Sequence, residues 1–203
     1  MKTMMLSLLL AGTSTLGFSQ FQLGAHGSYL QGTGNNDSRL WGGGLHGKFY
    51  LGGHIAIGAG FRTFPKTEKV TTGTSTVTTS DNLSQAFGSF DLLLARKKSL
   101  IQPFIGADAG LSFSTRSVLV ATGQSATAKV DNQSTFFYLA PKAGVNIGLS
   151  PAIGLFGTAS YGLTFGSGNP VNPGPIPNPI ETRPVDKFFV FDAGIYIRLV
   201  GAR

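Results

Sequence analysis

The chain contains no cysteine, and this absence excludes several kinds of chemistry at once. It rules out disulfide bonds, thiolate metal sites, a cysteine nucleophile and a lipid-modified N-terminal cysteine. Charged residues make up only 12% of the 203 positions, about half the usual share in a soluble domain. Beyond the first 19 residues no apolar run approaches the 18 residues that a transmembrane helix needs, so none is predicted there.

The first 19 residues have the features of a secretory signal peptide. Lys2 supplies a positive start, and an apolar run follows that is too short to span a bilayer. Gly17-Phe18-Ser19 has the small-x-small pattern of a signal-peptide cleavage site. We therefore expect cleavage after Ser19, leaving one domain over residues 20–203.

The clearest pattern in the remaining chain is the period-2 alternation of residues 187–199, KFFVFDAGIYIRL. One face holds every polar group and consists of Phe188, Val190, Asp192, Gly194, Tyr196 and Arg198. The other face is entirely apolar and consists of Phe189, Phe191, Ala193, Ile195, Ile197 and Leu199. Such alternation predicts a strand, and the apolar face is long enough to cross a bilayer as a tilted strand.

The same alternation recurs in eight segments, in a chain that holds 29 Gly and 16 Phe. The segments are residues 20–31, 40–50, 54–64, 83–95, 100–116, 134–149, 153–165 and 187–199. An even number of strands with charge on one face and apolar side chains on the other predicts an all-β, eight-stranded antiparallel up-and-down transmembrane β-barrel. Pro103 and Pro141 interrupt the pattern, and each marks either a β-bulge or a misplaced strand limit.

The predicted connections alternate between short and long. Residues 51–53, 96–99 and 150–152 are short turns, whereas residues 32–39, 65–82, 118–133 and 166–186 are longer. This asymmetry predicts short periplasmic turns and long extracellular loops, with both termini on the periplasmic side. The Ser/Thr-rich part of 65–82 has enough β-propensity to extend its hairpin, and the Pro-rich residues 169–184 favour an extended conformation.

Aromatic residues occupy the outward position at the long-loop end of every segment except the fourth. They are Tyr29, Trp41, Phe61, Phe113, Phe137, Phe165 and Phe189. Aromatic rings favour the headgroup level of a bilayer, so we predict that these seven residues form the outer aromatic girdle.

In pattern and spacing the chain resembles the small eight-stranded outer-membrane barrels, namely the OmpX-like proteins and the membrane domain of OmpA. The resemblance covers residues 20–203 and is specific for architecture rather than for an activity. It implies a location in the bacterial outer membrane, contact with outer-membrane lipid and lipopolysaccharide, and a monomer.

By alternation, seven charged residues face the lumen. They are Lys48, Arg62, Asp91, Asp108, Lys142, Asp192 and Arg198. A charge in so narrow an interior must be paired or hydrated, because a bare buried charge costs several kcal/mol. We expect a lumen charge network that fills the barrel, with a narrow ion path as the alternative.

His26 and His46 have the same lumenal orientation on neighbouring segments and lie opposite one another if their hairpin is centred near residue 36. Two histidines without a third ligand favour hydrogen-bonded lumen histidines over a metal site, and no cofactor is predicted. Some small barrels modify lipids, which needs a Ser–His pair at the membrane surface. None of the three histidines lies beside an outward serine.

The net charge of +7 raises the question of nucleic-acid binding. The basic residues do not gather on one face, and the long loops are close to neutral, so no nucleic-acid partner is expected. We predict a non-enzymatic protein with a plugged polar lumen that acts in adhesion, surface interaction or membrane integrity. Its loops would bind a surface protein or glycan. A narrow passive channel is the first alternative, and a lipid-modifying enzyme is the second.

Overall fold

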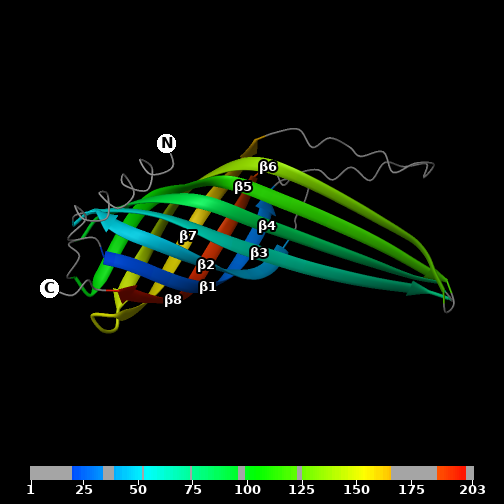
Figure 1. Cartoon of the computed structure of the whole chain (residues 1–203), viewed down its shortest axis with the longest axis horizontal. Helices are drawn as coiled ribbons and strands as arrows, with labels where there is room; N and C mark the ends of the chain where they lie inside the picture. Colours follow the sequence, from blue (N-terminus) through cyan, green and yellow to red (C-terminus); the bar gives the residue numbers. More distant parts are fainter. Residues whose placement is uncertain are drawn as a thin grey trace, which may run out of the picture.

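Eight antiparallel strands close into one barrel in the computed structural model of the chain (Figure 1). The structure describes residues 20–33, 39–51, 53–73, 75–95, 99–122, 125–165 and 187–199, and no helix in these ranges is long and apolar enough to cross a membrane. The strands are β1 (Gln20–Thr33), β2 (Arg39–Leu51), β3 (Ile55–Thr72), β4 (Ser75–Leu93), β5 (Ile101–Thr122), β6 (Ser125–Gly148), β7 (Ile153–Phe165) and β8 (Lys187–Leu199). The predicted fold class is confirmed, whereas the signal peptide and residues 166–186 lie outside the described residues.

The barrel closes with a stagger that tilts its strands. Paired residues can be followed once around the wall from Leu23 on β1, and the path returns to β1 at Thr33, ten residues further along. This stagger inclines the strands to the barrel axis, as closure of a sheet requires. Each strand is paired on both sides within the wall, so no backbone edge faces lipid there.

Four strands are longer than the alternation predicts. The expected extension of the 65–82 hairpin is confirmed, because β3 pairs with β4 up to Thr72 and Ser75. The predicted loop 118–133 is wrong in large part, because β5 pairs with β6 up to Thr122 and Ser125. The two hairpins also pair with each other, since Ser75 lies opposite Thr122. We call residues 65–72, 75–82, 115–122 and 125–133 the protruding sheet. Figure 1 shows these strands running on past the others.

There is a physical reason why the alternation of polarity did not predict the strands of the protruding sheet. Outside the membrane both of its faces meet water, so the apolar face that marks the other strands is lost. The segment 70–80, VTTGTSTVTTS, is rich in β-branched residues, which favour strands without any alternation of polarity. The positive φ of Gly73 (60°) lies in the turn between β3 and β4, where a side chain would be strained.

The two prolines cause neither a bulge nor a strand end. Leu139 pairs with Leu163 and Lys142 with Ser160, so the β6–β7 register is unchanged across Pro141 and only the pairing beside it is missing. Pro103 lies where the β4–β5 ladder ends, and its carbonyl accepts a bond from the Leu94 amide. Both sequence alternatives were wrong, because each missing N–H is accommodated at a local gap or at the end of a ladder.

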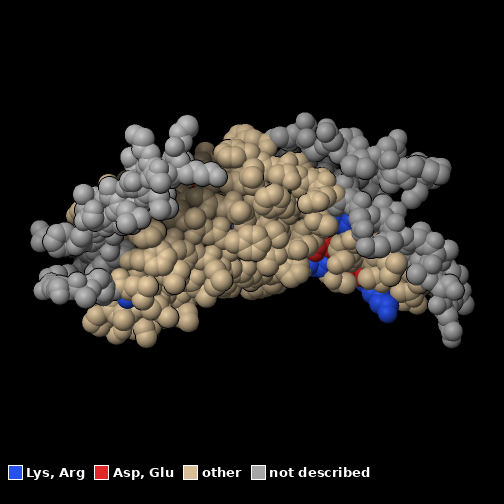
Figure 2. All heavy atoms as spheres, viewed as in Figure 1, with Lys and Arg blue, Asp and Glu red and all other residues tan. Residues whose placement is uncertain are grey.

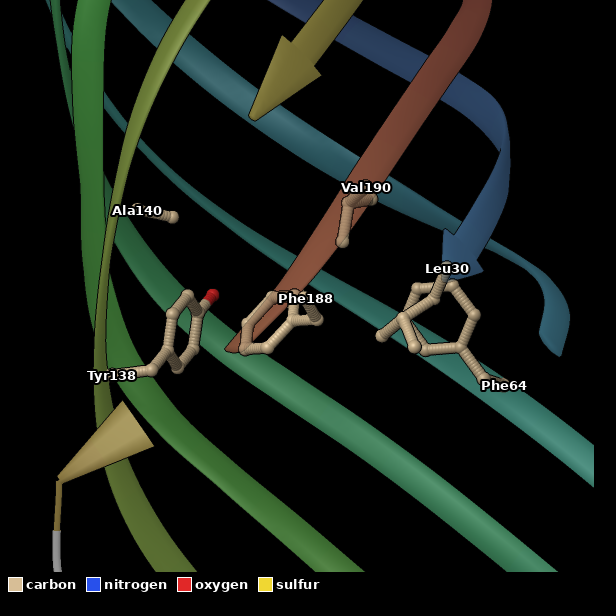
Figure 3. Packing of buried hydrophobic residues seen from close by; sticks show 6 residues of the cluster. All are labelled: Leu30, Phe64, Tyr138, Ala140, Phe188 and Val190. Atoms are coloured by element: carbon tan, nitrogen blue, oxygen red, sulfur yellow. The ribbon is translucent and has the colours of Figure 1, made fainter. Parts of the chain in front are cut away.

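The interior of the barrel is apolar at both ends and polar between them. At the long-loop end, buried side chains from four strands pack together: Leu30, Phe64, Tyr138, Ala140, Phe188 and Val190 (Figure 3). We call this the outer cap. At the opposite end Tyr50, Ala56, Leu93 and Phe104 form the inner cap. The sequence prediction of a uniformly polar lumen is therefore incomplete.

Lumenal glycines make room for the large side chains of the interior. In each case the ring lies over the glycine that is its partner on the neighbouring strand, so a methyl group there would overlap the ring. The five pairs are Gly24–His46, Gly60–Phe87, Gly144–Phe104, Gly154–Tyr196 and Gly162–Phe188. Small residues thus let a narrow barrel hold large ones.

Replacing Gly162 with valine should destabilise the barrel, since the added side chain must displace the buried Phe188 ring of the outer cap. Overpacking of this kind costs about 1–3 kcal/mol. Urea unfolding of the refolded protein in lipid vesicles measures the loss. Gly157, which has open space at its Cβ position, is the matched control: Gly157→Val should leave the midpoint nearly unchanged. Equal losses in the two variants would contradict the packing described here.

Candidate functional site

The wall of the barrel is inverted relative to a soluble protein. Outward side chains such as Trp41 and Ile195 are 74% and 55% exposed, whereas the inward Arg62 is fully buried. Figure 2 shows the visible wall as almost entirely uncharged, with charged side chains gathered toward the end that carries the protruding sheet. An apolar outer surface around a charged interior is the arrangement of a membrane-spanning barrel.

On β1 to β6 and on β8, the outward side chains change from apolar to polar between one outward position and the next. On each of these strands, the outward residue that follows the last apolar one toward the long-loop end is polar. In the order β1 to β6 and β8, these residues are Gln31, Arg39, Thr63, Ser84, Thr115, Thr135 and Lys187. We call these seven residues the polar rim. It marks the outer limit of the apolar belt.

The seven residues of the predicted girdle all lie directly below this level, but they do not form one continuous ring. Tyr29 contacts Trp41 with ring centroids 4.8 Å apart, and Phe137 contacts Phe165 at 6.2 Å. Phe189 contacts Tyr161 at 4.9 Å, a residue that the sequence argument did not include. Phe61 and Phe113 have no ring neighbour among the described side chains.

The first lumen cluster is built around Asp91. Its two carboxylate oxygens lie 2.7 Å from Lys48 Nζ and 2.8 Å from Lys142 Nζ. Lys142 also donates to Asp108 and to Ser89, each at 2.6 Å. The four charged groups come from four different strands and are all buried, so their charges offset one another inside the barrel.

The second cluster joins strands on opposite sides of the lumen. Arg62 Nη1 donates to Asp192 at 3.1 Å and its Nε donates to Gln85 at 2.6 Å. Ser28 Oγ donates to the other oxygen of Asp192 at 2.6 Å. The Arg62 guanidinium also lies over the Phe87 ring, 5.0 Å from its centroid, below the outer cap. Arg62 is thus held by an ion pair, a neutral acceptor and a ring face.

Arg198 lies apart from both clusters, at the inner end of the barrel. Its guanidinium carbon is 5.3 Å from the centroids of both the Tyr50 and Tyr196 rings, and its Nη2 donates to Gln102 at 3.4 Å. The sequence grouped Arg198 with the other six charges because alternation gives the direction of a side chain and not its partners.

The two lumen histidines lie side by side, with a different register and different partners from those expected. His26 pairs with Gly44 and His46 with Gly24, so the hairpin is centred one residue earlier than predicted. Their ring centroids are 5.5 Å apart, and both rings meet Phe156 edge-on. The expectation of a hydrogen-bonded histidine is contradicted at His26, since neither of its ring nitrogens has a hydrogen-bond partner among the described side chains, and at Nε2 of His46.

The histidines do not complete a metal site within the described part of the chain, where no group of three potential ligands comes together. His26 Nε2 is 3.9 Å from Asp192, too far for a hydrogen bond. The third histidine, His54, lies in the turn before β3, where its Nδ1 is 3.1 Å from the carbonyl oxygen of Leu93. What the lumen side chains build is a charge-paired plug between two apolar caps.

The protruding sheet has two different faces. The face continuous with the lumen carries Lys66 bridged to Glu68 at 2.7 Å and Asp81 bridged to Arg116 at 3.4 Å, and beyond them the exposed Val70 and Val77. The Lys66 ammonium lowers the pKa of Glu68 through a hydrogen bond and its charge. The face continuous with the membrane wall is instead rich in hydroxyl groups.

The edges of the protruding sheet are open among the described strands. β2 pairs with β3 only as far as Thr63, and β7 pairs with β6 only as far as Phe137. From these points outward, the outer edges of β3 and β6 have no strand partner in the described part of the chain. An open edge presents unpaired N–H and C=O groups to another chain.

No family model and no curated protein matches the chain. Solved structures do match. Ail, the attachment invasion locus protein of Yersinia pestis, in complex with the heparin analogue sucrose octasulfate, is 12% identical with a TM-score of 0.54, covering 89% of this chain and 97% of Ail. The outer membrane protein OprG from Pseudomonas aeruginosa is 10% identical with a TM-score of 0.51, covering 91% and 97%. The chain therefore has the fold of the small eight-stranded outer-membrane β-barrels.

Proposed function

We propose that the chain is a non-enzymatic protein of the bacterial outer membrane that acts at the cell surface through its protruding sheet. The observation that carries the proposal is the pairing of the two hairpins with each other. Because β4 and β5 are paired from the barrel wall to Ser75 and Thr122, four strands form one platform rather than separate loops. Eight residues beyond the rim correspond to about 25 Å of strand.

The chemistry of this platform supports a role in binding. Its lumen-side face combines two ion pairs with exposed Val70 and Val77, and its edges are open to strand addition. The barrel itself supplies an anchor, since paired charges and apolar caps fill its interior. Ail has been solved with a heparin analogue, which makes heparin a suitable first probe for a glycan partner.

Shortening the protruding sheet should abolish surface binding while leaving the barrel intact. Lys66 lies opposite Asp81, and Arg116 lies opposite Asn132. The residues between the members of each pair can therefore be replaced by a two-residue Asn-Gly turn without changing the strand register. Bacteria that display the shortened chain should adhere to cultured epithelial cells and to immobilised heparin no better than bacteria without the protein. The control is heat-modified gel mobility, which reports a folded barrel. Undiminished adhesion by the folded, shortened chain would refute the proposal.

The alternative of a narrow channel rests on the polar middle of the lumen, where buried atoms such as Gln85 Nε2 and Asn146 Oδ1 have no hydrogen-bond partner among the described residues. The outer cap argues against conduction, since Phe64 and Phe188 are almost fully buried across the lumen. We expect no conductance steps from the wild type in planar bilayers. The double variant Phe64→Ala/Phe188→Ala, which removes both phenylalanine rings of the outer cap, is the comparison in which a channel would be easiest to detect. Steady channel openings of the wild type would establish the channel instead.

A further inference from the structure

The lumen brings one amine and two carboxylates into direct contact away from water. Lys142 Nζ lies 2.8 Å from Asp91 Oδ1 and 2.6 Å from Asp108 Oδ1, and the three side chains are each only 4% exposed. They belong to β6, β4 and β5, so the amine reaches across β5 to a strand with which β6 does not pair. An amine and a carboxyl group that are held together in this way are the two reactants of an amide.

A glycine on the strand between them makes this contact possible. Gly106 of β5 is the partner of both Asp91 on one side and Lys142 on the other. A Cβ atom at this position would lie 2.6 Å from Asp91 Oδ1. The two side chains therefore meet over a strand position that carries no side chain.

The neighbouring groups supply what amide formation needs. The reaction requires a base that takes protons from the nitrogen and a cation that stabilises negative charge on the carbonyl oxygen. Asp108 lies 2.6 Å from Lys142 Nζ and is placed to act as the base. Lys48 Nζ lies 2.7 Å from Asp91 Oδ2, the oxygen that the amide keeps. Among the described contacts Lys48 touches one carboxylate and Lys142 two, so Lys142 is the amine that can be deprotonated.

We propose that Lys142 and Asp91 join in an isopeptide bond once the barrel has folded. Lys142 Nζ attacks Asp91 Cγ, and the bond between Cγ and Oδ1 breaks. Asp108 carries the two protons that the nitrogen loses, one after the other, to Oδ1, which leaves as water. An ammonium and a carboxylate contain the atoms of one amide and one water, so no oxidant, reductant or further reactant is needed.

Burial favours the product of this reaction. Each charge in the barrel interior carries a desolvation cost of several kcal/mol, and amide formation removes two of the four charges of the cluster. Lys48 and Asp108 then remain as one opposite pair. Fixed contact also replaces an encounter in solution, which corresponds to an effective concentration of up to about 10⁵–10⁸ M. The outer and inner caps on either side of the cluster limit the access of water that would hydrolyse the bond.

The bond would strengthen the base of the protruding sheet. It joins β4 to β6, two of the four strands that continue into the sheet. A force on the sheet would then be carried by a covalent bond between these strands in addition to their hydrogen bonds with β5. This benefit depends on the proposed surface role, whereas the chemistry of the bond does not.

The mass of the intact mature chain tests the proposal. The folded chain should be lighter than its sequence by one water molecule, and fragmentation of a protease digest should place the link between Asp91 and Lys142. Chain that has been kept in urea since synthesis should have the full mass, and it should lose the water only after insertion into lipid vesicles. A folded wild-type chain at the full mass would overturn the proposal.

Variants of the two lysines assign the lost water. Lys142→Arg keeps the cation but lacks the nucleophilic amine, so it should stay at its full mass. Lys48→Arg is the matched control, because the same exchange leaves the reacting pair intact, and it should still lose the water. A loss of water that persists in Lys142→Arg would assign it to another residue, such as a cyclised aspartate, and would overturn the bond.

Asp108→Asn tests the role of the base while keeping both reacting side chains. It should slow the loss of water by about 100-fold after insertion into vesicles. An unchanged rate would overturn the role of Asp108. All of these measurements use the purified chain, so their failure is distinct from a failure of the adhesion experiment, which measures binding by whole bacteria.

Discussion

Replacing Asp91 with alanine is expected to lower the free energy of unfolding of the barrel by about 3–5 kcal/mol. Asp91 holds Lys48 and Lys142 at 2.7 Å and 2.8 Å, and the side chains of all three residues are buried. Its removal leaves Lys48 without its carboxylate and Lys142 with Asp108 alone. Two buried ammonium groups then remain with one carboxylate, which is bonded to Lys142 alone. Urea unfolding in lipid vesicles, followed by tryptophan fluorescence of Trp41, measures the loss.

The matched control for this experiment lies on the same strand. Asp81 on β4 is also paired with a basic residue, Arg116 at 3.4 Å, but its side chain is 42% exposed. Exposed ion pairs contribute about 0–1 kcal/mol, so Asp81→Ala should have little effect on unfolding. The double variant Lys48→Met/Asp91→Asn should recover part of the lost stability, because one unpaired cation is removed. Equal effects of Asp91→Ala and Asp81→Ala would show that the lumen charges are hydrated rather than paired.

Placing a lysine on the lipid-facing wall is the second change with a large expected effect. Ile195 lies on the outward face near the middle of β8 and is 55% exposed. Ile195→Lys should lower the free energy of unfolding in bilayers by about 2–4 kcal/mol, because a charge at this depth must enter the hydrocarbon. The measurement is the same vesicle unfolding experiment.

A lysine placed at a different depth in the bilayer distinguishes this effect from a general intolerance of β8 to substitution. Leu199 is also outward and 53% exposed, but it is the last residue of the strand, at the inner interface. Leu199→Lys should therefore cost only about 0–1 kcal/mol. In detergent micelles, which adapt to a charge more readily, the difference between the two variants should shrink. A cost that does not depend on depth would contradict a bilayer-spanning β8.

The sequence predicted most reliably the strands whose two faces meet different surroundings. The limits of β7 and β8 were predicted to the residue, because their alternation begins and ends with the membrane wall. β3 to β6 continue into water, where both faces are mixed in polarity and alternation carries no signal. There the composition of 70–80 was the only indication of an extended hairpin, and the second hairpin at 118–133 was missed.

Side-chain direction was predictable along the chain, but side-chain partners were not. Alternation gives the inward position of Arg62 and Asp192, yet their contact joins β3 to β8 across the lumen, and only closure of the barrel creates it. In the same way the outer cap is built from inward apolar residues near the ends of four strands, among them Phe64 and Phe188. Alternation shows that these residues point inward, but not that they contact one another. Pairing between strands that are distant in sequence depends on the stagger of the whole barrel.

Accessibility scanning along β8 tests the inside-out arrangement most directly, and the absence of cysteine makes the chain ready for it. Single cysteines at 188–198 would each carry a nitroxide label in lipid vesicles. We predict that collisions with oxygen, which concentrates in hydrocarbon, are frequent at odd-numbered positions such as Phe191 and Ile195 and rare at even-numbered ones such as Val190. The opposite phase, or no alternation of period two, would contradict it.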